Sequence, residues 1–254
     1  MEKYTELLIK SSIDGSLEPS LFFSAKGEEK RPLLVGLHTW SHDRFNQINN
    51  LLPLAEKHNF NLLLPDFRGP NTTTNPRGQE ACCSDLAITD VFDAINYACA
   101  NYTIDSENVF VIGLSGGGQM ALMFGAKYPQ VAKSIAAFCP VCDLSNWMSF
   151  YQGNRGYCPD VMHCCKTKEE LIKRSPSSYA KELSKTNLKI FHGKFDNVVP
   201  VKQSISLFNE ILSIAPDSTV YLDVFDGKHE LDIVAAEHWI LSQYKPLTKT
   251  QITG

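Results

Sequence analysis

The sequence lacks the long apolar segments and the surplus of basic charge that define several large classes of protein. No apolar run approaches the roughly 18 residues of a membrane span, so we expect no contact with the membrane interior. The 24 basic and 28 acidic residues give a net charge of −4, which argues against a dedicated nucleic-acid binder. The N-terminal segment also lacks the basic start and apolar core of a secretory signal, and we therefore expect a cytoplasmic protein.

Cysteine, in contrast, is abundant, but the spacing of the eight residues does not indicate a disulfide framework. The adjacent pairs Cys82–Cys83 and Cys164–Cys165 suit a set of crosslinks poorly, and a chain of 254 residues can bury a large core without them. We expect reduced thiols. Zinc bound by Cys139, Cys142, His163 and the second pair is an alternative, but this set lacks a regular ligand spacing. We therefore expect no metal and no cofactor.

Short apolar runs alternate with helical patterns along the chain. Unbroken runs of this kind are typical of parallel strands that are covered on both faces. The alternation predicts an α/β fold with a mostly parallel, eight-stranded sheet, an antiparallel N-terminal pair and helices on both faces. The expected strands are Tyr4–Lys10, Ser20–Lys26, Pro32–His38, Phe60–Pro65, Val109–Leu114, Ser134–Cys139, Leu188–His192 and Thr219–Phe225, and the expected helices include Ser84–Ala100, Ser204–Ile214 and Leu231–Leu241.

The pattern continues from end to end without a repeat, a low-complexity tract or an obvious linker. We therefore expect a single domain over residues 1–254. Two segments interrupt the regular alternation. Residues at about 143–177 are rich in Cys, Tyr, Asn and Gly and predict a short cap-like insertion, and Arg68–Glu80 predicts an irregular loop.

A serine lies in a glycine-rich turn between a predicted strand and a predicted helix. Residues Gly113–Gly117 read Gly-Leu-Ser-Gly-Gly and follow the apolar run Val109–Leu114. A nucleophilic serine in a tight strand-to-helix turn brings the residues two before and two after it too close for a Cβ atom. Gly113 and Gly117 meet this requirement. The motif predicts Ser115 as a nucleophile at the start of a helix, whose N–H groups face the reacting centre.

A serine nucleophile needs a base, and the base needs an orienting carboxylate. Asp196 follows the predicted strand Leu188–His192, and His229 follows the predicted strand Thr219–Phe225. Both therefore belong with Ser115 at the carboxyl ends of parallel strands, where open α/β sheets bind ligands. Alone, the aspartate could belong to a turn and the histidine to an exposed loop. Their position at the same sheet edge as Ser115 favours the interpretation that the three residues act together in catalysis.

Hydrogen-bond donors for an oxyanion complete the predicted site. The N–H of Gly116, directly after Ser115, is the first expected donor. The second should come from the loop that follows Pro32–His38, where we expect the Trp40 N–H, with Thr39 as the alternative.

Aromatic side chains are the candidates for substrate binding. The Trp40 ring could form a wall of the acyl pocket, and Trp147 and Tyr151 lie in the irregular segment, where they could stack on a sugar or an aromatic group. Packing against the rim of the sheet is the alternative for each ring. His192 ends a predicted strand, and we expect it to be structural.

These residues resemble the α/β-hydrolase superfamily. The resemblance runs from PLLVGLHTW and LLLPDFRG through GLSGGGQMAL to HGKFDNVVP and GKHE, and the run SPSSYA before LKIFHGKFDNVVP is most similar to the prolyl-oligopeptidase-like branch of peptidases and esterases. The resemblance implies an α/β-hydrolase fold in which Ser115 is the nucleophile, Asp196 the acid and His229 the base. The motifs are specific for the fold and the triad but not for the substrate.

Two departures from the family pattern affect the expected function. The oxyanion loop reads His38-Thr39 instead of His-Gly, which leaves the second donor open. The peptidases of this branch carry a large N-terminal propeller, for which 254 residues leave no room, and we expect a catalytic domain without it to prefer esters over peptides.

We therefore expect a serine hydrolase that cleaves carboxylic esters through an acyl-enzyme. The short insertion favours short-acyl or aromatic-acyl esters, including carbohydrate-linked ones, over a deep lipid tunnel. The expected partner is a small-molecule or saccharide ester, and the sequence leaves a homo-oligomer open. The main alternative is a serine exopeptidase or amidase with the same triad, and a second is a non-catalytic protein that uses the pocket only for binding.

Overall fold

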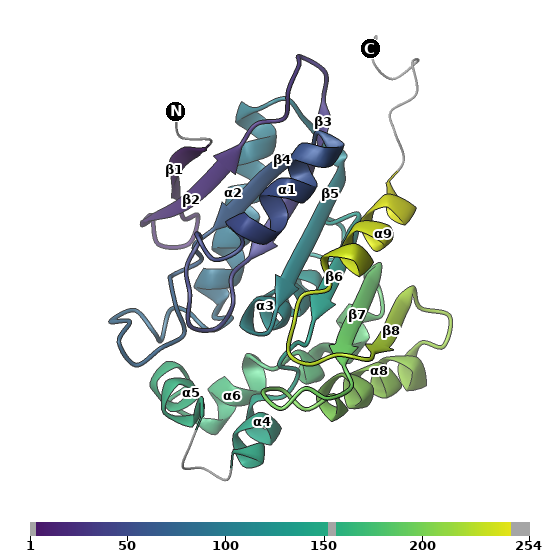
Figure 1. Cartoon of the computed structure of the whole chain (residues 1–254). Coiled ribbons are helices and arrows are strands. Elements are labelled where there is room, and N and C mark those ends of the chain that lie inside the picture. The colour runs from purple at the N-terminus through teal and green to yellow at the C-terminus, as the bar shows by residue number, and fades with distance from the viewer. Residues whose placement is uncertain (1–3, 152–155, 245–254) are drawn as a thin grey trace.

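The computed structural model describes residues 4–151 and 156–244, and its strands form one eight-stranded sheet (Figure 1). The strand order is β1-β2-β4-β3-β5-β6-β7-β8. The pairs β1–β2 and β2–β4 are antiparallel, and all the others are parallel, which confirms the predicted fold class. The strands are β1 (Thr5–Lys10), β2 (Leu17–Phe23), β3 (Arg31–Leu37), β4 (Asn61–Pro65), β5 (Ile104–Leu114), β6 (Ser134–Phe138), β7 (Leu188–Gly193) and β8 (Val220–Phe225).

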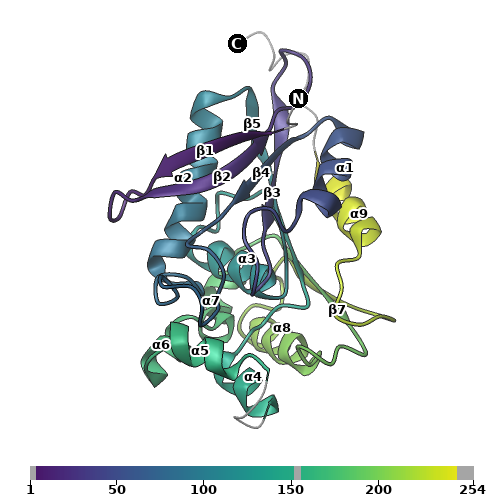
Figure 2. The ribbon, with the colours of Figure 1, turned by 60° about the vertical axis from the view of Figure 1, so that its left-hand side comes forward.

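Helices cover both faces of the sheet (Figures 1 and 2). Side chains of a strand alternate between the two faces, so Val109 and Val111 of β5 join one apolar core while Phe110 and Ile112 join the other. The first core includes α2 (Asp85–Asn101), α3 (Gly116–Lys127), α7 (Ala180–Leu183) and α8 (Lys202–Ile214), and the second includes α1 (Ile48–His58) and α9 (Ile233–Gln243). No helix within the described ranges is long and apolar enough to cross a bilayer.

Two strands differ in extent from their predictions. The strand β5 begins at Ile104, before the predicted start at Val109. The segment predicted at Ser20–Lys26 forms its strand earlier, at β2, because a tight turn returns the chain at once after β1. In this turn Gly15 has a φ of +76°, its N–H donates to the Ser11 carbonyl over 3.0 Å, and Ile9 already pairs with Glu18.

The irregular segment between β6 and β7 lies at the carboxyl edge of the parallel strands (Figure 1). It contains α4 (Leu144–Phe150), α5 (Cys158–Cys164), α6 (Lys168–Lys173) and the 3₁₀ helix η1 (Pro176–Tyr179). Its apolar side chains form a third core with residues of the strand-end loops, and this core includes Trp40, Leu144, Trp147, Val161 and Val199. The segment is therefore packed against the loops that follow the strands.

A buried arginine joins the second irregular loop to the N-terminal hairpin. The Arg68 side chain has no exposed surface. It donates to Asp14 over 2.8 Å, to Glu80 over 3.0 Å and to Ser11 over 3.1 Å, and it also pairs with the buried Asp90 of α2. One guanidinium therefore connects the hairpin, the loop and α2.

We expect Arg68→Met to destabilise the protein by about 3–5 kcal/mol, because it leaves the buried Asp90 carboxylate without its cation. The free energy of unfolding from urea titration measures the effect. Lys57→Gln is the control, because the Lys57 side chain is 62% exposed in its pair with Glu237, and it should cost less than about 1 kcal/mol. Equal losses in the two variants would contradict the role given to Arg68.

Candidate active site

Ser115 occupies a strained turn between β5 and α3. Its φ is +59°, and its N–H donates to the Phe138 carbonyl of β6 over 2.8 Å. A Cβ on Gly113 would lie 2.1 Å from the Gly117 carbonyl oxygen, and one on Gly117 would lie 2.4 Å from the Leu37 carbonyl oxygen. Neither position can carry a side chain, which confirms the prediction that both residues must be small. The turn leaves the serine at the carboxyl end of β5.

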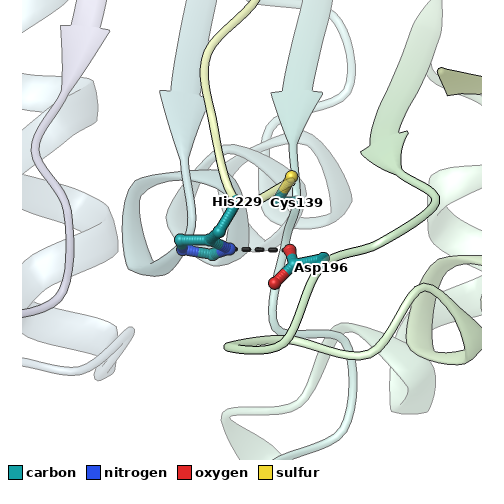
Figure 3. A group of neighbouring side chains, drawn as sticks. All are labelled: Cys139, Asp196 and His229. Carbon is teal, nitrogen blue, oxygen red and sulfur yellow. Dashed lines mark hydrogen bonds and ion pairs between the residues drawn. The ribbon is translucent and has the colours of Figure 1, made fainter. Parts of the chain in front are cut away.

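Asp196 and His229 are joined by a hydrogen bond at the same edge of the sheet (Figure 3). The loop after β7 carries the aspartate, the loop after β8 carries the histidine, and His229 Nδ1 lies 2.7 Å from Asp196 Oδ2. An ionised carboxylate only accepts, so Nδ1 carries the proton and Nε2 is left as the basic nitrogen. The other carboxylate oxygen, Oδ1, accepts the N–H groups of Val198 over 2.8 Å and of Val199 over 2.9 Å.

A second histidine contacts the same carboxylate. The fully buried His192 places Nε2 3.3 Å from Asp196 Oδ2 and 2.8 Å from the Val199 carbonyl oxygen, while its Nδ1 lies 2.7 Å from Ser204 Oγ. Burial alone would raise the pKa of Asp196, but hydrogen bonds from His192 and His229 hold it well below its usual range. Asp196 is therefore ionised at neutral pH. The sequence indicates a structural role for His192 but does not indicate its contact with Asp196.

Ser115 and His229 line one cavity of about 140 Å³. Their side chains form no direct hydrogen bond there, and a catalytic pair often forms one only when substrate is bound. The other lining residues are Thr39, Trp40, Ser41, His42, Leu114 and Tyr157. The described lining contains no carboxylate, lysine or arginine, so it suits an uncharged group.

The backbones of Gly116 and Trp40 are in contact beside Ser115. A Cβ on Gly116 would lie 2.8 Å from Trp40 Cα and 2.9 Å from Trp40 N. Gly116 is the first residue of α3, so its N–H has no partner within the helix. The Trp40 N–H donates to no group in the described part of the chain, whereas the Thr39 N–H already donates to Asn46 Oδ1 over 3.0 Å. Of the two predicted alternatives, Trp40 has the free donor.

The two predicted aromatic residues of the insertion lie outside the lining of this cavity. Trp147 is buried and its Nε1 donates to the Val198 carbonyl over 2.8 Å, and the Tyr151 hydroxyl donates to the same carbonyl over 2.7 Å. Tyr157 of the same segment does line the cavity, and its ring stacks on Trp147 with 5.0 Å between the ring centroids. Binding of substrate by Trp147 and Tyr151 stays a prediction.

Cys139 is a neighbour of Asp196 and His229 that the sequence did not indicate (Figure 3). Its sulfur and the nearest ligand atoms of Asp196 and His229 lie within 4.8 Å of one another, the only such group of possible metal ligands in residues 4–151 and 156–244. A metal there would displace the proton that joins Asp196 to His229, and burial raises the pKa of Cys139 to about 12, which keeps the thiol protonated. The zinc set considered from the sequence does not assemble among the described residues, and His163 instead bonds to the Asn75 carbonyl over 2.9 Å.

A larger cavity, of about 460 Å³, lies between α2, α3 and α6 and shares no lining residue with the cavity beside Ser115. Its charged groups are largely paired with one another, since Asp85 contacts both Lys127 and Lys173. Its described lining contains no histidine. Size alone therefore does not make it the reactive site.

Two curated relatives share sequence with part of the chain. Acylamino-acid-releasing enzyme 2 of Oryza sativa subsp. japonica is 30% identical over 141 residues, which are 52% of this chain and 18% of that protein. Feruloyl esterase B of Neurospora crassa is 27% identical over 109 residues, which are 41% of this chain and 37% of that protein. The chain thus spans well under two thirds of the length of either relative.

Solved structures share the fold at low sequence identity. An esterase of Pyrococcus furiosus has a TM-score of 0.67 and 20% identity, with 94% of this chain and 89% of that chain covered. A puromycin hydrolase has a TM-score of 0.76 and 16% identity, with 95% of this chain and 38% of that chain covered. These structures confirm the predicted α/β-hydrolase fold.

The resemblance seen in the sequence motifs also has support in a family match. Residues 82–243, more than half of the chain, match the prolyl oligopeptidase family, and the matched range includes Ser115, Asp196 and His229. The match begins before β5 and ends at the last residue of α9. The chain belongs to the prolyl oligopeptidase family of serine hydrolases.

Proposed function

We propose that this protein hydrolyses carboxylic esters through an acyl-enzyme, with Ser115 as nucleophile, His229 as base and Asp196 as the orienting acid. The observation that carries the proposal is the 2.7 Å hydrogen bond between His229 Nδ1 and Asp196 Oδ2, with His229 and Ser115 lining one cavity. A serine hydroxyl at neutral pH needs such a base, and the base needs a fixed tautomer.

In the first half of the reaction, Ser115 Oγ attacks the ester carbonyl carbon. His229 Nε2 takes the hydroxyl proton, and the ionised Asp196 stabilises the imidazolium that forms. The N–H groups of Gly116 and Trp40 donate to the carbonyl oxygen as it becomes negative. The imidazolium then protonates the leaving alcohol as the ester bond breaks, which leaves the acyl group on Ser115.

In the second half, water replaces the alcohol. His229 Nε2 takes a proton from the water as its oxygen attacks the acyl carbon, and the same two N–H groups stabilise the second oxyanion. Proton return to Ser115 Oγ releases the acid and restores the enzyme. Each proton passes through the one nitrogen that Asp196 leaves free.

The cavity supports a small or flat acyl group on a neutral substrate. Its volume of about 140 Å³ leaves little space for a long chain, and Trp40 and Tyr157 supply aromatic surfaces against which a flat acyl group or a sugar could pack. We therefore propose short-acyl or aromatic-acyl esters as substrates, including carbohydrate-linked ones. The likeness to feruloyl esterase B agrees with an aromatic acyl group.

A serine exopeptidase or amidase is the second candidate. Its support is the 30% identity with acylamino-acid-releasing enzyme 2. The described cavity lining offers no carboxylate that could pair with a free α-amino group, so an N-acylated substrate fits this alternative better than a free N-terminus.

We expect Ser115→Ala to lower kcat/KM on p-nitrophenyl acetate by about four or more powers of ten, because no other group supplies the nucleophile. The variant should also lose labelling by a fluorophosphonate while its circular dichroism spectrum is unchanged. Ser149→Ala, on the exposed surface of α4, is the matched control and should keep both activity and labelling. Wild-type turnover in the Ser115 variant would refute the assignment.

We expect Asp196→Asn to lower kcat by about four powers of ten, because an amide cannot accept hydrogen bonds on both of its terminal atoms. Either the His229 Nδ1–H or the two backbone N–H groups on Oδ1 would then face an NH₂ group, which donates and cannot accept. Asp223→Asn is the control, because Asp223 of β8 pairs with Lys189 over 3.1 Å and is a rival acid close to His229 in the sequence. A larger loss in the Asp223 variant would assign the acid there instead.

A panel of acyl donors separates the two candidate activities. We expect p-nitrophenyl acetate and methyl ferulate to be cleaved well, p-nitrophenyl octanoate to be cleaved less well because of the small cavity, and N-acetylalanyl p-nitroanilide to be poor. The measurement is kcat/KM divided by the uncatalysed rate of each compound, which removes differences in intrinsic reactivity. A greater rate enhancement on the anilide than on every ester would favour the peptidase.

A further inference from the structure

We propose that Trp147 and Tyr151 of the insertion are positioning residues, which hold the Asp196 loop by two hydrogen bonds to one backbone carbonyl. Trp147 Nε1 donates to the Val198 carbonyl oxygen over 2.8 Å, and the Tyr151 hydroxyl donates to the same oxygen over 2.7 Å. Val198 lies two residues after Asp196, in the loop between β7 and α8. The inference rests on the proposed function, because it concerns the acid of that site.

The carbonyl and the N–H of Val198 connect the insertion to Asp196. Its carbonyl accepts from Trp147 and Tyr151, and its N–H donates to Asp196 Oδ1 over 2.8 Å. The Val199 N–H donates to the same carboxylate oxygen over 2.9 Å. The path therefore runs from two side chains of the insertion through the Val198 backbone and the Asp196 carboxylate to His229, and each hydrogen bond orients the next.

Both donor side chains are fixed by their surroundings. Trp147 is 1% exposed, and its ring meets Trp40 edge-on with 5.0 Å between the ring centroids. A Cβ on Gly156 would lie 2.5 Å from two carbons of the Tyr151 ring, so the glycine leaves the space that this ring fills. Burial raises the pKa of Tyr151 to about 12, which keeps its hydroxyl protonated as a donor.

Hydrogen bonds also join the start of α4 to α8, the helix that follows the Asp196 loop. Gln203, in the first turn of α8, accepts the N–H groups of Cys142 over 2.9 Å and Asp143 over 2.7 Å. Its Nε2 donates to the Asp143 carbonyl over 3.1 Å and to Asn146 Oδ1 over 2.9 Å. The helix that carries Trp147 is therefore held in place against the element that follows Asp196.

The geometry favours positioning over direct substrate contact. The Trp147 N–H and the Tyr151 hydroxyl proton each already have a close acceptor, and neither residue lines the cavity that holds Ser115. A role through Val198 predicts a specific kinetic effect. Loss of these hydrogen bonds would leave the Asp196 loop less well held and would misorient His229 in the transition state. In that case kcat should fall while KM stays nearly constant.

The test compares two Tyr→Phe variants of the full chain. Tyr151→Phe removes only the hydroxyl that reaches Val198, and Tyr179→Phe removes a hydroxyl that donates to the Lys173 carbonyl over 3.0 Å, in the same insertion but away from the acid loop. We expect Tyr151→Phe to lower kcat on p-nitrophenyl acetate by about tenfold, with a larger loss in the double variant with Trp147→Phe. Tyr179→Phe should match the wild type.

Proton NMR supplies a readout that does not depend on turnover. The proton between His229 Nδ1 and Asp196 should give a low-field resonance in the wild type, which disappears in Asp196→Asn. We expect it to shift or broaden in Tyr151→Phe and to stay unchanged in Tyr179→Phe. Gly156→Ala, which pushes on the Tyr151 ring, should act in the same direction as Tyr151→Phe and does not require any change at Trp147.

Three results would overturn the inference. A raised KM with an unchanged kcat in Tyr151→Phe would indicate a substrate contact. An unchanged resonance and unchanged kinetics would show that the acid loop does not need this hydroxyl. Equal losses in Tyr151→Phe and Tyr179→Phe would indicate a general effect on folding. Failure of the proposed function looks different, because the wild type would then show neither turnover nor labelling of Ser115.

Discussion

A carboxylate without exposed surface lies behind the imidazole of His229, and hydrogen bonds have to stabilise its charge. Water cannot do so, because the Asp196 side chain is fully covered. Four protein groups surround it instead: the imidazoles of His229 and His192, and the N–H groups of Val198 and Val199. A buried charge with these partners has one favourable orientation, and that orientation fixes the tautomer and the direction of His229. The proposed chemistry depends on this arrangement.

The sheet order explains how residues far apart in the sequence reach this position. The strands β5, β6, β7 and β8 are consecutive neighbours and parallel, so their carboxyl ends lie at one edge. Ser115, Asp196 and His229 each follow one of these ends, and Cys139 follows the fourth. The serine turn adds a local constraint, because two glycines have to let the helix approach the strands. Non-local pairing and local backbone geometry therefore determine the site together.

The sequence predicted the parts of the site that obey these two rules. Strand ends can be recognised from apolar runs, and the Gly-Leu-Ser-Gly-Gly turn has a fixed spacing, so the fold and the meeting of Asp196 with His229 could be anticipated. The contacts of Trp147 and Tyr151 could not, because an irregular segment has no periodicity that shows which backbone group a side chain will reach. The contact of His192 with the acid depends likewise on how the loop after β7 folds back. The identity of a side chain shows which interactions it can make, but only the tertiary structure shows which group it contacts.

The position of the insertion couples its packing to the proposed catalytic acid. Tyr157 of this segment lines the cavity beside Ser115, while Trp147 and Tyr151, which pack against Tyr157, bond to the Asp196 loop. A change that enlarges the cavity at Tyr157 would therefore also alter the support of Val198. Because one aromatic cluster contacts both the cavity and the Asp196 loop, the proposed positioning role implies that a substitution within the cluster that reshapes the cavity also changes the support of His229. Thr39, Ser41 and His42 line the same cavity from the loop after β3, but Trp40 between them packs edge-on against Trp147 and Tyr157, so this loop also contacts the aromatic cluster.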